Sequence, residues 1–405
     1  MIDINKIRSD FPVLANKVYG KPLVYFDNAA TTQKPEMVIN AMKEAYTTYY
    51  SNIHRGVHAL SDISSEKYES AREKVRSFIK AGTAEEIIFT AGTTASINLV
   101  AFSFGERYIK SGDEVLISEL EHHANIVPWQ MMCERKNAHL KVIPVNDDGS
   151  LRIEEISRLI TDKTKLVAIT QVSNALGVIM PVKEIIQKAH EYNIPVLVDG
   201  AQGIQHGHVD VRDLDCDFYA FSGHKIYGPT GIGILYGKKK WLEEMPPYQG
   251  GGDMVERVSF EKTTYNKLPF KFEAGTTNFV GAIGIAKALD YIESVGMEDI
   301  ISHEKELTEY SCTRIKEIDG IKIYGDTNNK ISILSFLIDK VHQYDAGMIL
   351  DKMGIAVRTG SHCAQPVMTR FGIDGTIRAS MCFYNTKEEI DVLINGIEKV
   401  REMML

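Results

Sequence analysis

The most constraining feature of this sequence is a regular alternation of short apolar runs with amphipathic segments across residues 85–237. Seven apolar runs predict strands: 85–90, 113–118, 140–145, 164–172, 194–200, 216–225 and 231–237. Helices are predicted between them, for example at 93–109, 127–137 and 181–193. Strands that alternate with helices are typical of an α/β domain with a largely parallel sheet. We therefore predict a large α/β domain with a mostly parallel, seven-stranded sheet.

The pattern changes after about residue 290, where long amphipathic helices replace most of the strands. The last segment begins with Thr386 and carries Glu389 three residues later, which predicts a capped helix to the end of the chain. We therefore predict a smaller C-terminal α+β domain. No linker rich in Pro, Gly or Ser is present, so a continuous helix at 282–296 is expected to join the domains. The predicted divisions are an N-terminal segment packing on the small domain (1–20), the large domain (21–290) and the small domain (291–405).

Composition excludes several classes of function. The chain has 405 residues and a net charge of −8 without a basic patch, which disfavours nucleic acid as a partner. Its five cysteines are far apart and form no C-x-x-C pair, which argues against a disulfide framework and against a metal site. The N-terminus has no signal-peptide pattern, and no apolar run is long enough to span a membrane. We expect a cytoplasmic protein.

Two residues at the ends of neighbouring predicted strands indicate a cofactor. Asp199 ends one apolar strand, and Lys225 ends the next, beside a glycine-rich turn. Ligands of open α/β sheets bind at the carboxyl ends of the strands. A lysine enclosed there suits a Schiff base, and an aspartate can keep a pyridine nitrogen protonated so that the ring accepts electrons. Together they predict pyridoxal 5'-phosphate (PLP).

The sequence also offers a site for the phosphate and a partner for the ring. After the strand at 85–90, small residues open a helix and present free N–H groups to an anion. Further donors are expected from Thr93, Thr94, Ser222 and His224. The pair His122 and His123 follows another strand, so one imidazole can stack on the cofactor and move protons.

Cys363 lies in "RTGSHCAQP", a polar run that is unusual for a cysteine that only fills core space. Metal-ligand spacing is missing, which leaves a nucleophile or an accident of the loop. A thiolate nucleophile needs a cationic or hydrogen-bonding neighbour, for which Arg358 and His362 are the candidates. The other four cysteines are expected to be structural.

Many motifs of this chain match one family. They occupy residues 25–35, 51–61, 90–101, 120–130, 172–177, 198–202, 221–237, 250–254, 272–278, 357–366 and 377–385. Nearly end to end, the chain resembles the SufS-type (group II) cysteine desulfurases, which belong to the class V aminotransferases of PLP fold type I. One departure is Ser361, where the family often has a histidine.

The resemblance implies a role for each matched residue. Lys225 would be the Schiff-base lysine, Asp199 the partner of the pyridine nitrogen and His122 the stacking residue. Cofactor contacts would also come from Gln202, Thr93, Thr94, Ser222, His224 and, across a homodimer, Thr276. Substrate contacts would come from Asn174, Arg378, Arg358 and Ala30. Cys363 would accept the sulfur.

The implied activity converts L-cysteine to L-alanine and leaves a persulfide on Cys363. The sulfur would then pass to an acceptor protein of the SufE or SufU type, for iron–sulfur cluster assembly. Because the cysteine connection is short, it suits a separate acceptor. The alternatives are a selenocysteine lyase or cysteine-sulfinate desulfinase of the same fold, a class V aminotransferase without a persulfide, and a non-catalytic scaffold.

Overall fold

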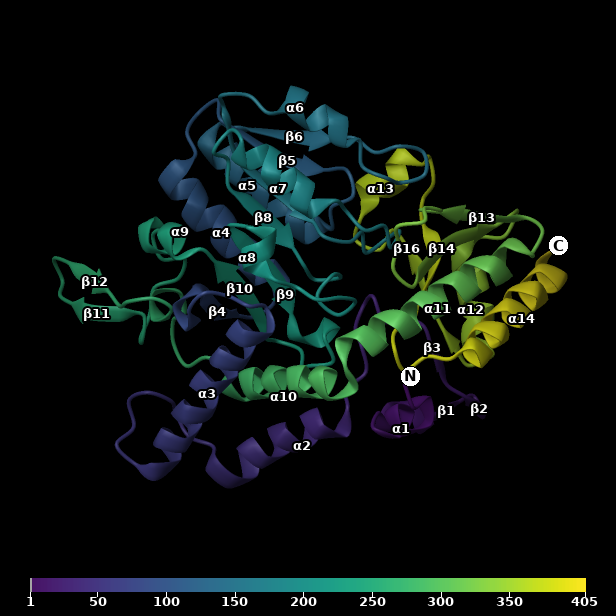
Figure 1. Cartoon of the computed structure of the whole chain (residues 1–405), viewed down its shortest axis with the longest axis horizontal. Coiled ribbons are helices and arrows are strands. Elements are labelled where there is room, and N and C mark those ends of the chain that lie inside the picture. The colour runs from purple at the N-terminus through teal and green to yellow at the C-terminus, as the bar shows by residue number, and fades with distance from the viewer. Residues whose placement is uncertain (1) are drawn as a thin grey trace.

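The computed structural model describes residues 2–405, and Met1, within the predicted N-terminal segment, lies outside the described residues. The large domain is built on a seven-stranded sheet of order β4–β10–β9–β8–β7–β5–β6 (Figure 1). Its strands are β4 (Ile87–Thr90), β5 (Glu114–Ser118), β6 (His139–Ile143), β7 (Thr164–Thr170), β8 (Val196–Asp199), β9 (Phe218–Ser222) and β10 (Gly233–Gly237). β10 runs antiparallel to both of its neighbours, β4 and β9, and the other strand pairs of this sheet are parallel. The predicted mostly parallel sheet is confirmed.

Helices cover both faces of this sheet, because its strands are apolar on both sides. Ile87 and Phe89 of β4 belong to one core, whereas Ile88 between them belongs to the other. The first core contains residues of α3 (Ala59–Phe78), α7 (Val182–His190) and α10 (Phe279–Val295). The second contains residues of α4 (Thr93–Tyr108), α5 (Val127–Lys136) and α9 (Lys239–Glu244).

The small domain is an antiparallel sheet with helices and a core of its own. The strand order is β13–β14–β17–β16, with β13 (Ile321–Tyr324), β14 (Ile333–Ile338), β16 (Arg358–Gly360) and β17 (Thr376–Ser380). Its helices are α11 (Met297–Lys316), α12 (Gln343–Lys352), α13 (Gln365–Arg370) and α14 (Lys387–Met404). The capping box of Thr386 and Glu389 begins α14, as predicted.

The connection between the domains differs from the expected continuous helix. Helix α10 covers the predicted stretch but ends at Val295, and Gly296 has a left-handed φ of 94°. A second helix, α11, then crosses to the small domain (Figure 1). Glycine adopts this φ without steric cost, so the chain can turn there.

The N-terminal segment contacts both domains. Arg8 in α1 (Ile4–Ser9) forms an ion pair with Glu389 of α14 (2.9 Å), while the Phe11 ring contacts that of Tyr227 in the large domain. β3 (Val24–Tyr25) pairs with β15 (Ile355–Ala356). The predicted domain limits are not tested by these contacts and stay predictions.

The remaining elements are short. They are β1 (Lys17–Val18), β2 (Lys21–Pro22), α2 (Glu36–Glu44), α6 (Ile156–Leu159), α8 (Val211–Leu214) and the hairpin β11 (Val255–Val258) with β12 (Thr263–Tyr265). None of the helices within residues 2–405 has the length and hydropathy that a bilayer crossing requires.

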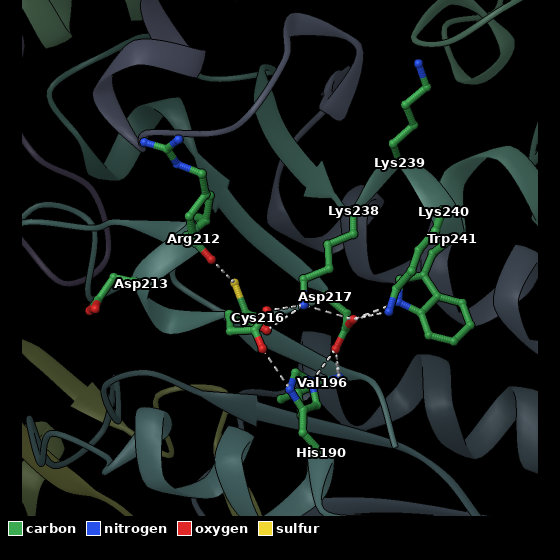
Figure 2. Close-up of polar contacts among 12 residues, drawn as sticks. His190, Val196, Arg212, Asp213, Cys216, Asp217, Lys238, Lys239, Lys240 and Trp241 are labelled. Atoms are coloured by element: carbon green, nitrogen blue, oxygen red, sulfur yellow. Dashed lines mark hydrogen bonds and ion pairs between the residues drawn. The ribbon is translucent and has the colours of Figure 1, made fainter. Parts of the chain in front are cut away.

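A buried aspartate anchors the sheet at the edge where β9 begins. Figure 2 shows Asp217 among His190, Trp241 and Lys238. Its carboxylate accepts hydrogen bonds from Trp241 Nε1 (2.7 Å), His190 Nε2 (2.8 Å) and the Val196 N–H (2.9 Å). Lys225 follows the other end of β9, so this cluster and the predicted site lie at opposite edges.

Candidate active site

The carboxyl ends of β7, β8 and β9 meet the start of α4 and a turn of the small domain around a cavity of about 210 Å³. Of the predicted site residues, only Thr276 does not line it. The predicted residues that do are Ala30, Thr93, Thr94, His122, Asn174, Asp199, Gln202, Ser222, His224, Lys225, Arg358, Cys363 and Arg378. Segments far apart in the sequence therefore place nearly all of the predicted residues around one cavity.

Lys225 and Asp199 both line this cavity, and the charge of each affects the pKa of the other. Burial lowers the pKa of the Lys225 amine to about 8, although the negative charge of Asp199 opposes that change. Burial also raises the pKa of Asp199, whose Oδ1 accepts a hydrogen bond from the Ala201 N–H (3.0 Å). The amine is thus partly neutral near neutral pH, as a nucleophilic or basic lysine requires.

Hydroxyl groups surround the beginning of α4. Ser222 Oγ accepts from the Thr93 N–H (2.8 Å) and lies 2.7 Å from Thr93 Oγ1. Burial lowers the pKa of His224 to about 4, so its ring is neutral, and its buried Nδ1 has no hydrogen-bond partner within the described part of the chain. A helix N-terminus with hydroxyls and an unpaired ring nitrogen can receive an anion.

His122 presents a neutral imidazole to the cavity. Its Nδ1 accepts a hydrogen bond from the Ala124 N–H (3.0 Å), so the ring proton lies on Nε2. Burial, assisted by the charge of Lys225, lowers its pKa to about 3. The side chain can therefore donate a hydrogen bond without carrying charge.

Glu121, which sequence reasoning missed, lies directly before His122. Burial raises the pKa of its carboxyl group to about 8. It accepts hydrogen bonds from Asn125 Nδ2 (2.7 Å) and the Thr170 N–H (3.0 Å), and so ties the His122 loop to β7. A carboxylate inside "LEHHAN" was the available signal, but its burial was not visible in the sequence.

Arg378 brings a buried positive charge to the cavity from the small domain. Its Nη1 donates to the Asn174 carbonyl (2.8 Å), and its Nη2 lies 3.2 Å from Asp27 Oδ1. Burial lowers the pKa of the guanidinium to about 10, which leaves it charged at neutral pH. The buried Arg378 Nε and Asn174 Oδ1 have no partner among residues 2–405. A guanidinium with free hydrogen-bonding capacity fits a carboxylate.

Cys363 lies on the short connection between β16 and α13, in a strained turn. His362 (φ 54°) and Cys363 (φ 56°) both have left-handed backbones, which L-residues other than glycine seldom adopt. His362 is neutral, because burial lowers the pKa of this ring to about 3, and its Nε2 lies 2.9 Å from Thr376 Oγ1. Of the two candidate neighbours, Arg358 alone can therefore offer a positive charge.

The other cysteines have different surroundings. Cys133, Cys216 and Cys382 are buried in hydrophobic cores, and burial raises the pKa of the Cys133 thiol to about 11. Cys312 is half-buried on α11 and packs against the small-domain core. All four are free thiols, as expected, and none lines the cavity among the described residues.

Thr276 lies apart from this cavity, on the segment before α10. Its hydroxyl lies 3.4 Å from Asn52 Oδ1, in an exposed position. The residue therefore has no place in the site of its own chain, and its expected role across a dimer stays a prediction.

Comparison with known proteins gives a consistent result. The aminotransferase class-V family pattern matches residues 24–393. A cysteine desulfurase of Escherichia coli O7:K1 (strain IAI39 / ExPEC) is 49% identical over 402 residues, which are 99% of this chain and 99% of that protein. A cysteine desulfurase of Synechococcus elongatus is also 49% identical over 98% of this chain, which spans 64% of that longer protein. The crystal structure of the cysteine desulfurase CsdA from Escherichia coli has a TM-score of 0.92 and 38% identity, with 100% of each chain covered.

Proposed function

Since this chain belongs to the class V aminotransferase family, and within it to the cysteine desulfurases, we propose that its cavity passes the sulfur of L-cysteine to Cys363. The observation that carries the proposal is the position of this thiol. Cys363 lines the same cavity as the enclosed pair Lys225 and Asp199. A nucleophilic sulfur therefore faces the groups that would activate the substrate.

The residues present fit pyridoxal phosphate. Asp199 offers a buried carboxylate for the pyridine nitrogen, and Gln202 keeps a buried Oε1 without a partner among the described residues while its Nε2 donates to the Ala29 carbonyl (2.7 Å). The start of α4 suits the phosphate. His122 would lie against the ring. When bound, the cofactor supplies an aldehyde that takes an amine and a ring that accepts electrons from the substrate.

Arg378 and Asn174 would hold the carboxylate of L-cysteine. The guanidinium is kept in place by Asp27 and by the Asn174 carbonyl, so it can orient the substrate without reorganising. Arg358 and Ala30 line the same cavity and would complete the substrate site.

Lys225 and His122 would handle the protons. A Lys225 amine with a pKa of about 8 can take the Cα proton of the substrate and, as the ammonium, give a proton back to the product or to water. His122 donates through Nε2 and remains neutral, so it can protonate a departing or developing group near the substrate's side chain.

Cys363 would act as its thiolate. Its sulfur attacks the substrate sulfur, so that a sulfur–sulfur bond forms and the carbon–sulfur bond of the substrate breaks. The electron pair of the broken bond stays on Cβ, which gains a proton to give L-alanine. The enzyme keeps a persulfide on Cys363.

The partners are part of the proposal. A homodimer is supported by the exposed apolar side chains Val258, Phe260 and Tyr265 on the β11–β12 hairpin, and by the position of Thr276 outside its own chain's cavity. The persulfide would pass to an acceptor protein of the SufE or SufU type for iron–sulfur cluster assembly, since the strained turn gives Cys363 little reach. Five free cysteines suit a cytoplasmic location.

A substrate panel tests this function. Wild type, Cys363→Ala and Lys225→Ala proteins loaded with the cofactor are given L-cysteine, L-selenocysteine or L-cysteine sulfinate, and alanine is measured. We expect Cys363→Ala to lose only the L-cysteine activity and Lys225→Ala to lose all three. Equal loss on all substrates in Cys363→Ala, or keto-acid formation by wild type, would contradict the proposal. Cys312→Ala is the matched control, because Cys312 is the other cysteine that is not fully buried.

A further inference from the structure

The turn that carries Cys363, residues 361–364, belongs to the small domain but is hydrogen-bonded to the large domain. Asn174 Nδ2 donates to the His362 carbonyl (2.6 Å), and the His123 N–H donates to the Cys363 carbonyl (2.8 Å). These two donors lie on different loops, which follow β7 and β5. Two consecutive carbonyls of one turn are thus held from two directions.

The His123 side chain adds a third bond. Its Nε2 accepts from the N–H of Gln365, the first residue of α13 (3.2 Å). A nitrogen that accepts carries no proton, so the proton of the neutral ring lies on Nδ1. His123 therefore contacts the chain on both sides of Ala364, through its backbone and through its ring.

Such external bonds matter because the turn is strained. Left-handed φ values at His362 and Cys363 have to be stabilised by the surroundings. The direction of the thiol depends on the backbone of Cys363, since Cβ is fixed to that Cα. Relaxation of the turn would rotate the sulfur away from the substrate, and a misplacement of this kind slows a reaction strongly.

We propose that His123 is a positioning residue for sulfur transfer, an inference that rests on the proposed function of Cys363. Its neighbour His122 lines the cavity, whereas His123 is absent from the cavity lining in the described chain. The two adjacent imidazoles therefore have separate tasks and carry their protons on different nitrogens. One faces the reacting groups, and the other holds the turn that carries the thiol.

This assignment predicts a selective defect. Loss of the His123 ring removes the bond to Gln365 but leaves Lys225, Asp199 and Arg378 in place. Removal of the substrate Cα proton would continue, because it does not involve Cys363. Sulfur transfer to Cys363 would become about five- to tenfold slower, the effect of one lost hydrogen bond on a strained turn.

The test compares His123→Ala, His123→Gln and His139→Ala in the cofactor-loaded enzyme. The Gln side chain can still accept from Gln365, and His139 is an exposed histidine on β6 that serves as the matched control. Three rates are measured: persulfide formation on Cys363 in the first turnover, exchange of the Cα proton of L-alanine with deuterated solvent, and amide hydrogen exchange of residues 361–365 in cofactor-free protein.

We expect His123→Ala to slow persulfide formation and speed amide exchange of the turn, with Cα exchange within about twofold of wild type. His123→Gln should restore most of the persulfide rate, and His139→Ala should change nothing. An unchanged persulfide rate in His123→Ala, or a His123→Gln protein as slow as His123→Ala, would overturn the inference. Parallel loss of Cα exchange would also overturn it, because the defect would then be general.

Failure of the proposed function gives a different result. In that case the wild-type enzyme exchanges the Cα proton but forms no persulfide on Cys363, and the inference falls with the function. If wild type forms the persulfide and His123→Ala does so equally fast, only the inference fails.

Discussion

The amine of Lys225 should react as a neutral nucleophile at a pH where ordinary lysines are almost fully protonated. Burial lowers its pKa from 10.5 to about 8, and the charges of Arg378 and Arg358 act in the same direction. Asp199 opposes the change, but burial outweighs it. At pH 7 about a tenth of such amines are neutral, against about 3 in 10,000 for an ordinary lysine, a difference of roughly 300-fold.

Competitive acetylation of the cofactor-free protein measures this directly. The Lys225 peptide is quantified by mass spectrometry between about pH 6 and 10, with exposed Lys240 as the internal reference. We expect the Lys225 rate to rise with pH and level off above about pH 8. In Asp199→Asn the levelling should move to lower pH, because the anion that favours the ammonium form is removed. A Lys225 rate that keeps rising through about pH 10 would refute the argument that burial controls this amine.

Three further predictions concern stability and protonation. Glu273→Gln should lower the free energy of unfolding by about 3–5 kcal/mol in urea titrations, because it breaks the buried pair with Arg72 (2.7 Å); a loss below about 1 kcal/mol would contradict this. Asp217→Ala should cost about 3 kcal/mol, since it leaves Trp241 Nε1 and the Val196 N–H without an acceptor, yet should leave cofactor affinity unchanged at the opposite edge of the sheet; weaker cofactor binding would count against it. The His122 ring should show no titration between about pH 5 and 8 in NMR spectra of the cofactor-free protein, because burial lowers its pKa to about 3; a midpoint near 6.5 would contradict control of this ring by burial.

The sheet and most of the site could be predicted because their signals are local. Each strand is an apolar run, and Asp199 and Lys225 directly follow such runs. The carboxyl ends of parallel strands meet at one edge, so neighbouring strands bring these two residues together. The order of apolar runs and polar ends was enough for that inference.

Other features depend on contacts that no local pattern encodes. The ring of His123 bonds to Gln365, which lies 242 residues further along the chain. His362 is neutral because the fold buries its ring. The break between α10 and α11 depends on the backbone of Gly296, and a glycine alone does not predict a break, since glycines also occur inside helices. At such positions the residue type is known from the sequence, but its contacts and its burial could not be predicted.

The most direct test of the account is the location of the sulfur after a single turnover. Cofactor-loaded enzyme is mixed with less than one equivalent of L-cysteine, and the thiols are then blocked. The mass of each of the five cysteine-containing peptides is measured by mass spectrometry to find the one that has gained a sulfur atom. We predict that the sulfur is found on Cys363 alone, with one L-alanine formed for each persulfide, and on no cysteine in Cys363→Ala. Persulfide on another cysteine, or on the Cys363→Ala protein, would contradict the central claim.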